Sequence, residues 1–243
     1  MKYREDNDLE FLKNCSSEDL DVLVTILTKD KDGDIRFTEE LTSTDLFKEH
    51  FPKHAEYWPL IAAELQTYAA NSIATIFRGG EGVPYREALI DVCDKINVNY
   101  NPKASVELIE MNLLMKILRD SLEKMTTEDM KAVVEELDLK TTDFTPEAVT
   151  AALQAGILFS GFTAYKVALI VANAVAKAII GRGLTFAANA GIARTIGIFA
   201  GPIGWAITTL FTLYDVAGPA YRVTIPAVIQ VAFLRAKRRF QTN

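Results

Sequence analysis

The feature that most constrains this chain is the uneven distribution of charge along it. Residues 151–243 contain nine Lys and Arg residues and one acid, Asp215, which gives this region a net charge of +8. The whole chain carries −6, so residues 1–150 carry −14. Such an asymmetry indicates two regions with different physical roles. We expect an acidic, water-soluble region over 1–150 that folds alone, followed by a basic, apolar region over 151–243.

The composition supplies ample material for a core. The chain has 243 residues, of which 49% are hydrophobic and 24% charged, so both kinds must be segregated along the sequence. The two cysteines, Cys15 and Cys93, have no spacing typical of a disulfide framework or a zinc site. The first residues are polar and lack an apolar signal segment. We expect residence in the cytoplasm or at the cytoplasmic face of the inner membrane, not secretion.

The first region shows helix start signals throughout. Ser16 with Asp19, and Thr126 with Asp129, have the spacing of a capping box. Thr145-Pro146 places a cap before a proline that suits the first helical turn. Apolar residues repeat with a period near 3.6, and no long run alternates with period two. The sequence therefore predicts an all-α fold, with at most a small hairpin over 32–38.

The second region is rich in small residues. Alanines recur every fourth residue in its first segment, and glycines do so in a second segment, 195–214, which has no charge. Stripes of small residues let helices approach closely, in lipid or in a protein core. We expect an all-α multi-helix bundle with a C-terminal Gly/Ala-rich apolar helical hairpin. The predicted helix-packing residues are Ala164, Ala168, Ala172, Ala176, Gly197 and Gly201.

This apolar hairpin has two interpretations. A membrane span needs about 20 apolar residues. Segment 195–214 has that length but contains four threonines, three glycines and a proline, and the first segment contains Lys166 and Lys177. The basic cluster at 235–239 favours contact with anionic lipid. The alternative is that these helices form the buried centre of a soluble bundle.

Several stretches resemble the bacterial YaaW-like family, whose function is not established. They cover nearly the whole chain, and part of that family is described as similar to ubiquinol–cytochrome c chaperones, which are helical assembly factors. The resemblance supplies no catalytic residues. The matching stretches are 8–12 with Cys15, 27–33, 58–66, 78–80 and, most specifically, 220–228.

No motif indicates catalysis, a cofactor or a resident metal. Residues 28–39 overlay the calcium-loop template, with Asp30, Asp32 and Glu39 at ligand positions, but Thr28 stands where the first carboxylate belongs. His50 and His54 lie four apart, with a proline between them that interrupts a shared helical face. A charged turn and a proline-broken segment are the simpler interpretations.

The sequence thus favours a non-enzymatic, membrane-associated helical protein with a cytoplasmic interaction module. Its expected partners are membrane lipid or another copy through 151–234, with a protein partner also considered and nucleic acid disfavoured by the acidic region. The alternative is a soluble, chaperone-like assembly factor that shelters an apolar partner helix.

Overall fold

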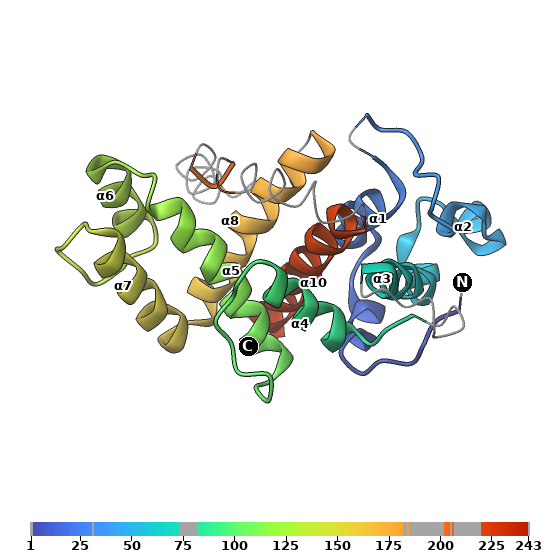
Figure 1. The fold of residues 1–243 in the computed structure, drawn as a ribbon, viewed down its shortest axis with the longest axis horizontal. Coiled ribbons are helices and arrows are strands. Elements are labelled where there is room, and N and C mark those ends of the chain that lie inside the picture. The colour runs from blue at the N-terminus through green and yellow to red at the C-terminus, as the bar shows by residue number, and fades with distance from the viewer. Residues whose placement is uncertain are drawn as a thin grey trace.

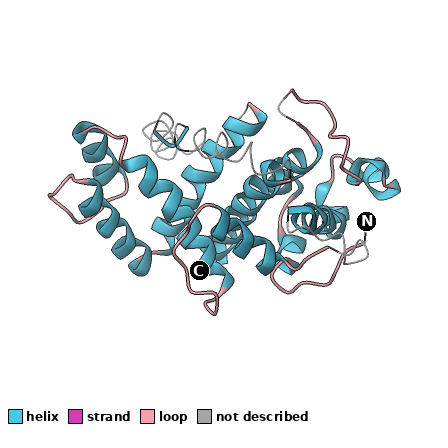
Figure 2. Cartoon of the chain, viewed as in Figure 1, coloured by secondary structure: helices cyan, strands magenta, loops and turns pink. Residues whose placement is uncertain are grey.

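The computed structural model confirms the all-α prediction (Figures 1 and 2). It describes residues 2–30, 32–72, 82–181, 184, 202–204, 206 and 220–242. Within these ranges the single β feature is an isolated antiparallel bridge between Lys29 and Ile35. The small hairpin considered over 32–38 is therefore reduced to one bridge around a tight turn.

The N-terminal helices begin where the sequence places caps. The Ser16 hydroxyl accepts the amide of Asp19, and the Asp19 carboxylate accepts the amide of Ser16, so the predicted capping box is present. The first elements are η1 (Glu10–Asn14), α1 (Ser17–Thr28), η2 (Leu41–Ser43), α2 (Asp45–His50), η3 (His54–Tyr57) and α3 (Trp58–Ser72).

Capping side chains and a proline also determine where the next helices begin. Ser105, Thr126 and Thr145 each accept an amide of the first turn through their hydroxyl groups. Pro146 stands at the first position of its helix, as predicted. These elements are α4 (Tyr85–Lys95), α5 (Val106–Leu122), α6 (Thr127–Glu136) and α7 (Pro146–Phe159).

Two helices of the basic region form the centre of the molecule. They are α8 (Gly161–Ile180), which ends at the left-handed Gly181, and α10 (Tyr221–Thr242). They pack most extensively on each other, and α10 also contacts α1, α3, α4 and α5. Figure 1 shows α10 crossing the middle of the molecule, with α1 and α3 on one side and α5 and α8 on the other. From Val223 to Arg235 every residue of α10 is buried, as expected of a central helix.

Helix α8 contains most of the predicted alanine stripe. Ala168, Ala172 and Ala176 are buried, whereas Ala164 is half-buried. The packing role assigned to these alanines stays a prediction, since burial alone does not name the helix that each contacts. Gly197 and Gly201, which lie in the second arm of the expected hairpin, fall outside the described residues.

The proposed division of the chain falls inside a helix. Residues 150 and 151 are consecutive positions of α7, and α10 of the second region packs on four helices of the first. The two-region organisation over 1–150 and 151–243 stays a prediction. In the described part of the chain, the helices of both regions contribute to one hydrophobic core.

Among the described helices, α8 has the length and composition of a membrane span. Its most apolar 18-residue window has a mean hydropathy of 1.5, and 67% of that window is buried inside the protein. A core helix of a soluble protein satisfies the same criteria, so this feature alone does not indicate a membrane.

Candidate functional site

A buried ion pair joins α5 to α10. The Arg235 guanidinium donates from Nε to both carboxylate oxygens of Glu110, at 3.1 and 2.9 Å, and the two side chains are only 10% and 4% exposed. The Tyr85 hydroxyl of α4 donates to the same carboxylate at 2.7 Å. Burying these charges is tolerated because each carboxylate oxygen has a donor.

Arg235 also fixes the N-terminal segment. Its Nη2 donates to the backbone carbonyl of Asp8, and its guanidinium lies 4.3 Å from the centre of the Phe11 ring. Leu9 and Leu12 of the same segment are fully buried. One side chain of α10 thus connects the N-terminal segment, α4 and α5.

Burial controls the ionisation of this pair. It raises the pKa of Glu110 to about 7, although the charge of Arg235 and the hydrogen bonds from Tyr85 and Arg235 act in the opposite direction. Because Arg235 lowers this pKa, removing that residue would raise it further, and the carboxylate would take up a proton more readily.

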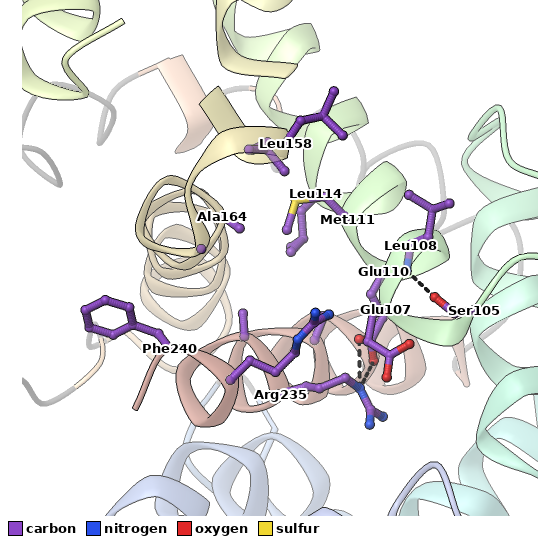
Figure 3. Close-up of a pocket in the computed structure, with 15 residues that line it drawn as sticks. Ser105, Glu107, Leu108, Glu110, Met111, Leu114, Leu158, Ala164, Arg235 and Phe240 are labelled. Carbon is purple, nitrogen blue, oxygen red and sulfur yellow. Dashed lines mark hydrogen bonds and ion pairs between the residues drawn. The ribbon is translucent and has the colours of Figure 1, made fainter. Parts of the chain in front are cut away.

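A cleft of about 380 Å³ lies beside this pair. Figure 3 shows Met111, Leu114 and Leu158 on one side of it, with Arg235 and Glu110 across from them. Small residues of α8 and α10, which we call the floor of the cleft, also line it: Gly161, Ala164, Ala232 and Ala236. The lining consists of Ser105, Glu107, Leu108, Glu110, Met111, Leu114, Ile157, Leu158, Gly161, Ala164, Ala232, Arg235, Ala236, Arg239 and Phe240.

Large apolar side chains stand exposed at the rim of this cleft. Leu158 at the end of α7 is 84% exposed, Leu108 of α5 is 53% exposed, and Phe240 of α10 is 41% exposed. Phe240 also stacks on Tyr165 with a centroid distance of 5.1 Å, which ties the end of α10 to the start of α8. The cleft therefore combines exposed apolar side chains with charged groups, and such a combination occurs in binding sites.

The calcium-loop resemblance has a structural explanation. The Asp30 carboxylate accepts the amides of Asp32 and Asp34 at 2.9 and 3.0 Å, which closes the turn. Glu39 instead accepts the amide of Thr42 at 2.9 Å. The described residues contain no group of three or more His, Cys, Asp or Glu side chains arranged to hold a metal ion.

The two histidines have different surroundings. His54 is buried, where Nδ1 contacts the Tyr57 hydroxyl and Nε2 lies 3.3 Å from Asp21, and burial lowers its pKa. His50 lies at the end of α2, with its Nε2 3.9 Å from Glu49. His54 serves the packing of η3 on α1.

Sequence reasoning missed the pair and the cleft. The sequence places Arg235 in a basic cluster that is expected to contact anionic lipid, and for Arg235 this expectation is wrong, because the residue is only 8% exposed. A usable signal was present in α5, because Glu110 lies on the apolar face with Val106, Ile109 and Leu113. A lone acid on an apolar face predicts a buried partner.

Comparisons with known proteins give the family. A protein of Helicobacter pylori (strain J99) named "UPF0174 protein" is 50% identical over 98% of this chain and 94% of its own length. The "UPF0174 protein YaaW" of Escherichia coli (strain K12) is 32% identical over 97% of this chain and 96% of its own. The chain belongs to the UPF0174 family. The resemblance to YaaW-like proteins is thereby confirmed.

Two family models also match this UPF0174 protein. Residues 3–37 match a domain of unknown function (DUF3944), and residues 53–230 match the family described as ubiquinol-cytochrome C chaperone. No solved structure matches the chain significantly. In this UPF0174 protein the two matched segments are packed together, since α1 contacts α3, α8 and α10.

Proposed function

We propose that this protein is a non-enzymatic assembly factor that shelters an apolar helix of a client protein in the cleft between α5, the α7–α8 junction and α10. The observation that carries the proposal is the exposed apolar rim over a floor of small residues. Gly161, Ala164, Ala232 and Ala236 leave room above the floor for large apolar side chains of a bound helix. Such a groove is a common receptor for amphipathic helices.

The family match supports the same proposal. The model that matches 53–230 is named for a chaperone, and this range includes α5, α7, α8 and the buried start of α10. The Glu110 carboxylate beside the cleft is already bonded to Arg235 and Tyr85. A binding role therefore fits these residues better than a catalytic one.

The test is binding of a fluorescein-labelled, 20-residue Leu/Ala-rich helical peptide to the full chain, followed by fluorescence anisotropy. Leu158→Glu places a charge on the rim and is expected to weaken binding about tenfold to a hundredfold, since burying a leucine contributes about 1.5–3 kcal/mol. Phe37→Glu is the matched control, because Phe37 is fully exposed and does not line the cleft. Equal loss in both variants, or no binding by the wild type, would refute the proposal.

A second candidate function is association with a membrane surface. Helix α8 has the composition of a span, and exposed Phe240 adjoins the basic residues Arg238 and Arg239. Aromatic and basic side chains together favour the interface of an anionic bilayer. The proposal places the protein in the cytoplasm or at the cytoplasmic face of the inner membrane. Co-flotation of the full chain with phosphatidylglycerol vesicles, but not with neutral vesicles, would favour this function over the first.

A further inference from the structure

The charges at the cleft are balanced by opposite signs. Four charged residues line it, and two of them, Glu110 and Arg235, neutralise each other within the chain. The other two are Glu107, in the first turn of α5, and Arg239, near the end of α10. In the part of the chain that the structure describes, neither has an ion-pair partner within 4.0 Å. Each is available to a group from another molecule.

Glu107 is held in its charged form. Burial would raise its pKa, but the hydrogen bonds of the helix start and of Ser105, with the charges of Arg235 and Arg239, lower it below the ordinary value. An arginine is charged at any physiological pH. The cleft therefore presents one fixed negative and one fixed positive charge beside an apolar centre.

Such a surface is complementary to itself. In a contact with twofold symmetry, the same patch of each copy meets its counterpart, so residue i of one copy meets residue j of the other and the reverse. A client helix without charged side chains would form no ion pair with Glu107 or Arg239, and an anionic amphiphile would face Glu107. A second copy supplies an opposite charge to both Glu107 and Arg239 and apolar side chains to the centre.

We propose that a second copy of this chain covers the cleft in a symmetric dimer, in which Glu107 of each copy pairs with Arg239 of the other. The inference rests on the proposed function in that both use the cleft as the binding surface. Leu158, which is 84% exposed, is then removed from water against the small-residue floor of the second copy. A client helix binds by displacing that copy, so the dimer is the resting state.

Analytical ultracentrifugation of the full chain tests the dimer. Glu107→Arg alone and Arg239→Glu alone each oppose like charges twice across the symmetric contact, and each is expected to weaken the dimer about tenfold or more. An equimolar mixture of the two variants is expected to form a mixed dimer, because both contacts then pair opposite charges. Phe37→Glu is the control and should sediment as the wild type does. Circular dichroism establishes that every variant remains folded.

The outcomes separate the two proposals. The dimer proposal is overturned if the wild type is monomeric throughout the concentration range, if the single variants dimerise as tightly as the wild type, or if the mixture stays monomeric. A monomeric wild type that still binds the labelled peptide would leave the proposed function standing. A dimer that behaves as expected, but neither binds the peptide nor is dissociated by it, would remove the proposed function and keep the dimer.

Discussion

Replacing Arg235 by Met keeps a long side chain in α10 but removes the charge that Glu110 faces. The Glu110 carboxylate then keeps its bond from Tyr85 and loses both contacts, of 2.9 and 3.1 Å, with the guanidinium. Its side chain is 4% exposed, so water does not replace them. Removing one partner of a buried ion pair costs about 3–5 kcal/mol of unfolding free energy. Because the Asp8 carbonyl also loses a donor, we expect the upper half of that range at pH 8.

The double variant Glu110→Leu/Arg235→Met is expected to lose far less unfolding free energy than the sum of the losses in the two single variants. Glu110→Leu alone strands the buried guanidinium and costs a similar ~3–5 kcal/mol. With both residues replaced, no charge is left unpaired, and the cost reduces to the lost partners of Tyr85 and Asp8, about 1 kcal/mol each. Single costs of about 4–5 and 3–5 kcal/mol against a double cost of about 2 kcal/mol give an expected coupling energy of about 5 kcal/mol or more.

Urea unfolding followed by far-ultraviolet circular dichroism measures these free energies. The exposed pair of Glu10 and Lys13, with side chains 53% and 51% exposed, is the matched control and should show a coupling below about 0.5 kcal/mol. Because Arg235 lowers the pKa of Glu110, Arg235→Met raises that pKa above the wild-type value of about 7, so the cost of the substitution should be smaller at pH 5, where the carboxylate is protonated with or without Arg235, than at pH 8. Single effects that add to the double effect within about 0.5 kcal/mol would show that the pair is not a buried unit.

Three further results are expected. Gly82→Ala should destabilise the protein by about 1–3 kcal/mol in urea unfolding, because the added Cβ would lie 2.6 Å from Cβ of Gln66, whereas Gly161→Ala meets nothing within 4 Å and should have little effect. Burial raises the pKa of Glu64 to about 7, above its unfolded value. The free energy of unfolding of the wild type should therefore fall by about 3 kcal/mol between pH 4.5 and pH 7, whereas that of Glu64→Gln should not show this fall; identical pH profiles would contradict this. The fragment 1–150 should bind a hydrophobic dye and unfold without cooperativity, because α10 packs on four of its helices; a sharp unfolding transition would instead support the sequence-based prediction that this region folds alone.

Signals between residues close in sequence predict most of the helices. The starts of α1, α6 and α7 follow from a few neighbouring residues, because a hydroxyl or carboxylate that caps a helix acts within one turn. The long apolar face of α5 is equally visible in a periodicity of 3.6. Such features need no knowledge of the tertiary structure.

The candidate site depends on contacts between distant residues. Glu110 and Arg235 are 125 positions apart, and Lys237, which the sequence assigns to the same basic cluster, pairs with Asp19. The sequence predicts one basic surface over this cluster, whereas the structure buries part of it against acids of the first region. The cleft was also hidden, because it forms only where α5, α8 and α10 meet.

The bond from Arg235 to the Asp8 carbonyl joins residues 227 positions apart. At synthesis rates of about 5–20 residues per second, Asp8 is made roughly 11–45 seconds before Arg235. During that time the first helices lack the helix around which they pack, and the apolar faces of α1, α3 and α5 are open to other chains in the cell. The native arrangement can close only after α10 has been made, so we expect the nascent chain to be open to aggregation until then.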